Sequence, residues 1–94
     1  MTNPSTETAI LTVLGKRLVE QRLPTLMRLK DRLDEGEVLT DYDIRFLQEA
    51  FTDAQNNKAL IDHNPESQEI SAQVLHLYKV IMDQATANEN ARKQ

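Results

Sequence analysis

The sequence contains no cysteine and no tryptophan, and only two glycines, three prolines and four aromatic residues. Without cysteine the chain can form no disulfide, no cysteine-ligated zinc site and no thiol nucleophile. So few glycines and prolines leave few positions for tight turns, which disfavours an all-β fold with its many hairpins. Together these absences predict a helical protein without disulfides or thiol chemistry.

Long hydrophobic runs are also missing. The longest apolar stretches, such as residues 9–14, are far shorter than the roughly 20 residues that a membrane span needs. The first eight residues are polar and lack the basic start and apolar centre of a signal peptide. Because 39% of the 94 residues are hydrophobic and 28% are charged, we expect one folded, cytoplasmic domain over residues 1–94, with disordered ends at 1–4 and 89–94.

The charge is unevenly distributed along the chain. The formal net charge is −4, yet residues 1–33 hold six basic and three acidic side chains, a net of +3, so residues 34–94 carry −7. This asymmetry predicts a basic helix that lies against acidic ones within the same molecule.

Hydrophobic spacing predicts a first helix from about Ser5, its N-cap, to Glu35. Its apolar positions recur every three or four residues, and Pro24 interrupts them. Proline removes one helical hydrogen bond and clashes with the preceding turn. Leu23 would cap a new helix poorly, so we expect one helix that continues through Pro24 with a kink.

The stretch Lys30–Asp43 surrounds Gly36 with acidic residues, which raises the question of a calcium loop. An EF-hand loop needs oxygen ligands at positions 1, 3, 5 and 12, with glycine at position 6. If Gly36 is sixth, Leu33 and Tyr42 are third and twelfth, and neither supplies a carboxylate. The stretch is therefore interpreted as a bend between two helices.

The bend interpretation gives most of these residues a role. Gly36 can take the left-handed conformation that ends a helix. Thr40 can cap the next helix with Asp43 three residues later, in the pattern of a capping box. Leu39 and Ile44 have the spacing of a hydrophobic staple around that cap.

Two further helices are predicted, Asp41–Ile61 and Pro65–Asn88, the second with Asn64 as its N-cap. The short connection between them predicts an antiparallel hairpin. The fold expected is all-α, an up-down-up bundle of three helices whose first helix is kinked at Pro24. The predicted core positions are Leu14, Leu18, Leu26, Leu29, Leu33, Ile44, Leu47, Phe51, Ile70, Val74, Leu77 and Ile81.

Catalytic and metal-binding patterns were not found. His63 and His76 have no glutamate three residues before them, so the helical di-iron pattern is absent. Ser67 and Ser71 are interpreted as solvent-facing residues at a helix start, and no glycine-rich phosphate loop is present. Asp43 is expected at the surface with an ordinary pKa. We therefore expect no enzyme, no metal and no cofactor.

The remaining function class is protein–protein interaction or regulation without chemistry of its own, with another protein or a second copy as partner. Aromatic and methionine side chains at the edge of a core are enriched at interfaces. The predicted partner-binding residues are Tyr42, Phe46, Tyr78 and Met82. The alternative is a nucleic-acid-associated accessory protein that contacts phosphates through a row on the basic first helix, formed by Lys16, Arg17, Arg28 and Arg32.

Overall fold

The computed structural model describes residues 4–93, and its side chains from Thr6 to Lys93. The described part is 90% helical and contains no strand, so the all-α prediction is confirmed. Its elements are α1 (Pro4–Arg17), a π-helical turn η1 (Leu18–Arg22), α2 (Leu23–Asp34), α3 (Asp41–Asn56), α4 (Lys58–Asp62) and α5 (Pro65–Lys93). Residues 1–3 and 94, which the disordered-end prediction includes, lie outside the described residues, and so does the side chain of the predicted cap Ser5.

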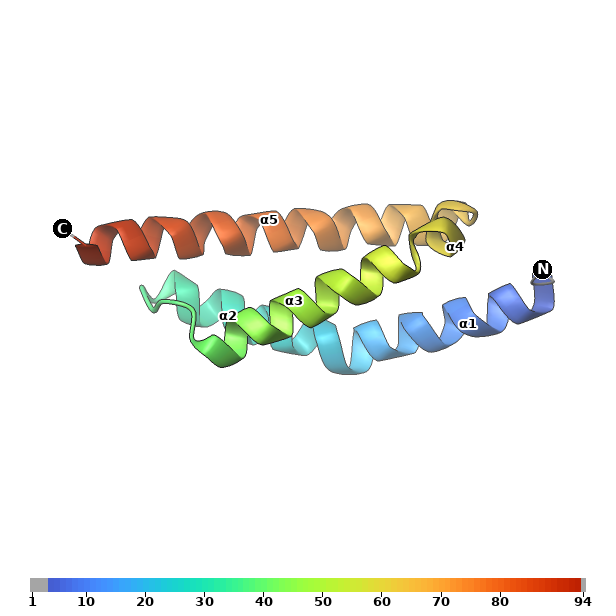
Figure 1. Cartoon of the computed structure of the whole chain (residues 1–94), viewed down its shortest axis with the longest axis horizontal. Coiled ribbons are helices and arrows are strands. Elements are labelled where there is room, and N and C mark those ends of the chain that lie inside the picture. Colours follow the sequence, from blue (N-terminus) through green and yellow to red (C-terminus); the bar gives the residue numbers. More distant parts are fainter. Residues whose placement is uncertain (1–3, 94) are drawn as a thin grey trace.

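The helices lie side by side along one long axis (Figure 1). α1, η1 and α2 lead from one end of the molecule to the other, α3 crosses back in front of them, and α5 runs the full length. These elements form four separate helical segments, residues 4–34 and helices α3, α4 and α5, rather than the three helices expected.

Just before Pro24 the helix forms a π-helical turn, and the predicted proline kink is not confirmed. The N–H of Leu23 donates to the carbonyl of Leu18, five residues earlier. A regular helix would place Leu18 and Leu26 about 80° apart around its axis, because eight residues exceed two turns. The wider π turn reduces that offset, so Leu18, Arg22 and Leu26 face the same space.

The bend between α2 and α3 has the predicted structure. Gly36 has φ 95°, the N–H of Glu37 donates to the Arg32 carbonyl at 3.2 Å, and the N–H of Gly36 donates to Leu33 at 3.0 Å. This is the Schellman arrangement that closes a helix C-terminus. The Thr40 hydroxyl accepts from the Asp43 N–H at 3.1 Å, while the Thr40 N–H donates to the Asp43 carboxylate at 2.9 Å. The capping box is therefore confirmed.

The two glycines should respond to alanine with opposite signs. Gly15 lies inside α1, and a Cβ added there meets nothing within 4 Å. Gly15→Ala should raise the free energy of unfolding by about 0.5–1 kcal/mol, because alanine loses less backbone entropy in a helix. Gly36→Ala should lower it by about 1–2 kcal/mol, because an L-residue is strained at positive φ. Urea unfolding of both variants checks this, and equal signs would contradict it.

The predicted helix Asp41–Ile61 is interrupted at Asn57, which separates α3 from α4. The Asn57 side-chain amide and backbone N–H both donate to the carbonyl of Asp53, at 2.8 and 3.2 Å. Asparagine side chains compete with helical hydrogen bonds in this way. The following cap is as predicted, since the Asn64 side chain accepts from the Ser67 N–H at 3.0 Å.

α5 continues to Lys93, five residues beyond the predicted end at Asn88. The Asn88 amide donates to the carbonyls of Leu33 and Glu37, each at 2.7 Å. These bonds join the last turns of α5 to the C-terminus of α2, so this part of α5 has a partner that hydrophobic spacing could not reveal.

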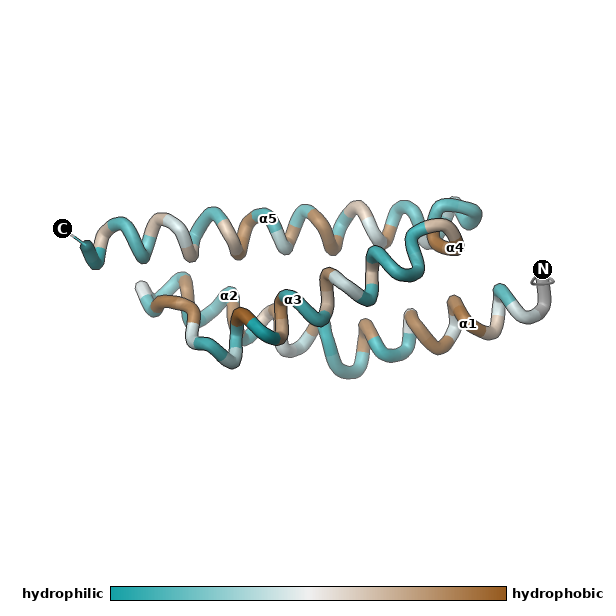
Figure 2. The backbone as a smooth tube through the Cα atoms, in the orientation of Figure 1, coloured by the Kyte–Doolittle hydropathy of each residue, from teal (hydrophilic) through white to brown (hydrophobic). Residues whose placement is uncertain are grey.

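The buried core occupies one half of the molecule. It consists of Leu26, Leu29, Leu33, Leu47, Ile81 and Ala85, with Leu33 and Ile81 fully buried. Hydrophobic positions recur turn by turn along the helices (Figure 2), but no described residue of α1, η1, α4 or 65–80 is buried. Three predicted core residues are exposed instead: Ile44 by 42%, Phe51 by 41% and Ile70 by 50%.

The exposure of Ile44 has a physical cause. The side of α3 that carries Asp43 and Leu47 faces the interior, and these residues are 5% and 3% exposed. The neighbouring side, which carries Ile44, faces solvent. Asp43 holds both the cap of α3 and an ion pair to Arg32 of α2, and these contacts fix how α3 faces its neighbours.

Candidate functional site

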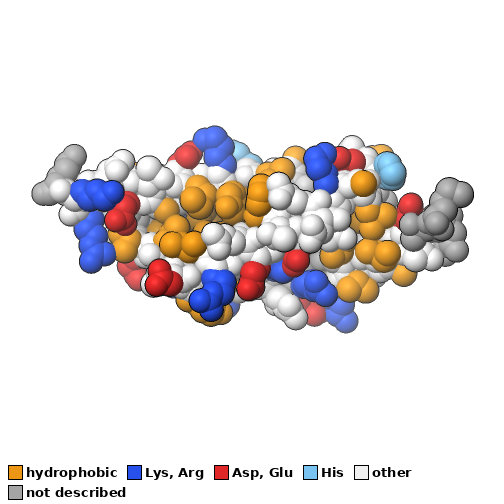
Figure 3. Space-filling view, viewed as in Figure 1, with side chains coloured by type: hydrophobic (Ala, Val, Ile, Leu, Met, Phe, Trp, Pro, Cys, Tyr) orange, Lys and Arg blue, Asp and Glu red, His pale blue; other side chains and the backbone are white. Residues whose placement is uncertain are grey.

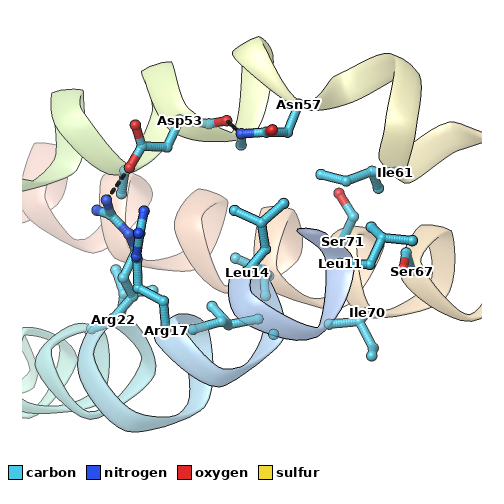
Figure 4. A pocket seen from close by; sticks show the side chains of 16 residues that line it. Leu11, Leu14, Arg17, Arg22, Asp53, Asn57, Ile61, Ser67, Ile70 and Ser71 are labelled. Atoms are coloured by element: carbon cyan, nitrogen blue, oxygen red, sulfur yellow. Dashed lines mark hydrogen bonds and ion pairs between the residues drawn. The ribbon is translucent and has the colours of Figure 1, made fainter. Parts of the chain in front are cut away.

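An apolar hollow lies in the other half of the molecule, between α1 with η1, the junction of α3 and α4, and the first half of α5 (Figure 4). Its volume is about 210 Å³. An apolar cavity of about 150 Å³ can hold a benzene-sized molecule. The hollow therefore has room for one or two large apolar side chains.

Large apolar residues form much of its wall. Leu11 and Leu14 reach into it from α1, Ile61 from α4, and Ile70 borders it on α5 (Figure 4). Leu11, Leu14 and Ile61 are half-buried, and Ile70 is 50% exposed, so the hollow is open to solvent. In the single chain these apolar side chains stay partly exposed to water, so part of the free energy available from burying them is not gained.

Small residues explain why the hollow stays unfilled. Five positions on three helices bring little side-chain volume to the same space: Gly15, Ala50, Ala54, Ser67 and Ser71. In addition, α2 packs closely on α5, whereas α1 lies near α4 and makes few close contacts with α5. The helices thus diverge where their side chains are smallest.

One end of the hollow is charged. Arg22 of η1 forms an ion pair with Asp53 of α3, with side-chain exposures of 21% and 44%. Arg17 also borders the hollow and lies beside Arg22 (Figure 4), but it forms no ion pair within residues 6–93. With two guanidinium groups and one carboxylate, this end carries a net positive charge.

The residues predicted to bind a partner lie at the packed half. Tyr42 is 74% exposed at the start of α3. Phe46, Tyr78 and Met82 are half-buried and pack against the core. Tyr78 also stacks on Phe51, with ring centroids 5.9 Å apart. Three of the four predicted residues thus cover the protein's own core, and only Tyr42 among them is largely exposed to a partner.

The predicted basic row does not form a continuous free surface. Arg32 forms ion pairs with Asp43 and Glu37, and the Arg28 guanidinium donates to the Thr25 hydroxyl at 3.2 Å. Lys16 and Arg17 are exposed on α1, before the π turn. Basic side chains of the first segment therefore pair with α3, through Arg22 and Arg32, as the charge asymmetry predicts.

Asp43 corrects the prediction of a surface residue with an ordinary pKa. Its side chain is only 7% exposed. Burial alone would raise the pKa of Asp43, but hydrogen bonds from the Thr40 backbone and the Arg32 guanidinium outweigh it and hold the pKa below its ordinary value. The same hydrogen bond to Asp43 raises the pKa of Arg32.

The serines of α5 also differ from the prediction. Ser67 and Ser71 are half-buried and border the hollow, rather than facing solvent. His63 and His76 are exposed. Among residues 4–93, no group of three or more acidic or histidine side chains is placed to hold a metal ion.

Sequence reasoning did not locate the hollow, although one signal was present. Small residues recur at helical spacing, as Ala50 and Ala54 on α3 and as Ser67 and Ser71 on α5. That spacing can indicate either two helices that pack closely or a space that no side chain fills. Only the position of α1 relative to α5 decides between these two cases.

Comparison of the chain with protein-family models, curated proteins and solved structures finds no match. No helix in the described part of the chain is long and apolar enough to cross a membrane.

Proposed function

We propose that this protein is a small helical interaction module that binds another polypeptide through the hollow and its rim. The observation that supports the proposal is the open apolar hollow itself, because uncovered side chains of this kind favour burial by a partner. In this proposal the chain is an up-down-up helical bundle. One half holds the buried core, and the other half holds the open hollow.

Exposed apolar residues on the two helices that flank the hollow support the same role. Ile10 and Val13 of α1 are 37% and 57% exposed, and Ile70 of α5 is 50% exposed. Figure 3 shows hydrophobic side chains gathered toward each end of the visible face, between charged residues at the edges. An apolar centre with a charged rim is the usual composition of a protein interface.

Photo-crosslinking in the cells that make the protein tests this proposal. A photoreactive residue at position 70 should give discrete crosslinked products, because that side chain borders the hollow. The matched control is position 75, since Leu75 is on the same helix and 51% exposed but does not border the hollow. Absent products at position 70, or the same products from both positions, would contradict the proposed function.

Phosphate binding is the weaker alternative, with support only from the exposed Lys16, Arg17 and Arg28. Arg32 is occupied by carboxylates of its own chain. Binding through the remaining three residues would weaken steeply with added salt.

A further inference from the structure

The chain exposes more surface than a compact protein of its mass. Its accessible surface is 6887 Å², whereas a compact monomer of 10.8 kDa exposes about 5,500 Å². The radius of gyration, 15.3 Å, also exceeds the roughly 12–13 Å of a compact domain of this length. The excess surface is about 1,300 Å² per chain.

This excess matches the size of a subunit interface. If two chains each covered about 1,300 Å², the interface would total about 2,600 Å², which lies within the range of obligate homodimers. With six buried apolar residues among those described, the single chain has a small core that such an interface would extend.

The exposed faces of α1 and α5 beside the hollow, here called the α1 wall and the α5 wall, carry opposite charges next to apolar residues. Of the residues named below, Arg17 and Ile70 border the hollow itself. Ile10, Val13 and Arg17 follow at spacings of three and four, so they share one side of α1. Glu66 lies three and four residues before Glu69 and Ile70, so these share one side of α5.

The charges of both walls are available to a partner. Arg17, Glu66 and Glu69 are exposed, and none of the three forms an ion pair within the described residues. The basic wall of one molecule is thus complementary to the acidic wall of another identical molecule.

We propose that the polypeptide bound at the hollow is a second copy of this chain, with the α1 wall of each copy against the α5 wall of the other. A two-fold axis makes each contact occur twice. Arg17 of each copy then faces the acidic α5 wall of the other copy. Apolar side chains of each α1 wall then enter the other copy's hollow. This inference rests on the proposed function and specifies its partner.

Light scattering coupled to size-exclusion chromatography of the full chain gives the first test. The expected result is twice the chain mass at micromolar concentration. Ile70→Lys should reduce this to the mass of one chain, while Leu75→Lys, equally exposed and on the same helix, should leave the dimer intact. Both variants should keep their helical circular dichroism, because both sites are already half exposed.

Charge reversal gives the decisive test. Arg17→Glu alone, and Glu66→Lys with Glu69→Lys, should each raise the dimer dissociation constant about tenfold or more, because like charges then meet twice. An equimolar mixture of these two variants should form a heterodimer of nearly original affinity. The controls Arg28→Glu and Glu89→Lys change exposed residues outside both walls and should have little effect.

The outcomes separate this inference from the proposed function. A monomeric native chain, or variants whose mixing restores nothing, overturns the second copy as partner. If position 70 then crosslinks to a polypeptide of another mass, the proposed function stands with a different partner. If position 70 gives no crosslinked product, the proposed function fails as well.

Discussion

Replacing Leu33 by alanine should lower the free energy of unfolding by about 3–5 kcal/mol, because Leu33 is one of the two fully buried large side chains among the described residues. Leu33 is fully buried on α2 among six buried apolar residues, with Ile81 of α5 in the same cluster. The truncation removes apolar contacts and leaves a cavity that the neighbouring helices cannot fully close. Urea unfolding followed by circular dichroism, at fixed protein concentration, measures the change.

Leu75→Ala is the matched control, because Leu75 is 51% exposed and lies outside that cluster. Its expected effect is within about 0.5 kcal/mol. If Leu33→Ala lowered the free energy of unfolding by less than about 1 kcal/mol, α2 would not face the core in solution as it does in the structure.

Asp43→Ala should cost about 2–3 kcal/mol at neutral pH. The side chain supplies one half of the capping box and accepts from Arg32, so its removal ends two interactions at once. Arg32 is 38% exposed, so water can rehydrate its guanidinium, and we expect less than the full cost of a buried unpaired charge. Asp41→Ala, at an exposed position of the same helical turn, should cost under about 1 kcal/mol.

The stabilisation by Asp43 should disappear in acid. Its pKa in the folded chain lies below the ordinary value of about 4, so above that pH the carboxylate is ionised in both states and the stabilisation is complete. As the pH falls through the lowered pKa, the unfolded chain binds the proton more readily and the stabilisation is lost. The difference in unfolding free energy between the native chain and Asp43→Asn should therefore be largest near pH 7 and should shrink steadily as the pH falls below about 4. A difference that does not change with pH in acid would contradict the assignment.

Local features of the fold could be predicted because neighbouring residues determine them. Gly36 ends α2, Thr40 with Asp43 starts α3, and Asn64 starts α5, each as the sequence indicates. Helix spacing also identified Leu26, Leu29, Leu33, Leu47 and Ile81 among the core residues.

Features that depend on distant contacts could not be predicted. The ion pair between Arg32 of α2 and Asp43 turns the Asp43 side of α3 inward, so the apolar spacing of α3 alone wrongly placed Ile44 in the core. The last turns of α5 are held by bonds from Asn88 to Leu33 of α2 and to Glu37 of the bend, although the local sequence has no apolar period there. The hollow follows from the divergence of α1 and α5, which no single helix specifies.

The bond between Asn88 and Leu33 joins residues 55 positions apart, and the buried core also combines α2 with the second half of α5. During synthesis α2, the bend and α3 emerge first, so the leucines of α2 have no α5 to cover them until the chain beyond Ile81 leaves the ribosome. Closing this long loop costs entropy before the contacts between α2 and α5 are gained. The nascent chain thus exposes the leucines of α2 until α5 emerges, a period in which chaperones and premature association compete with folding.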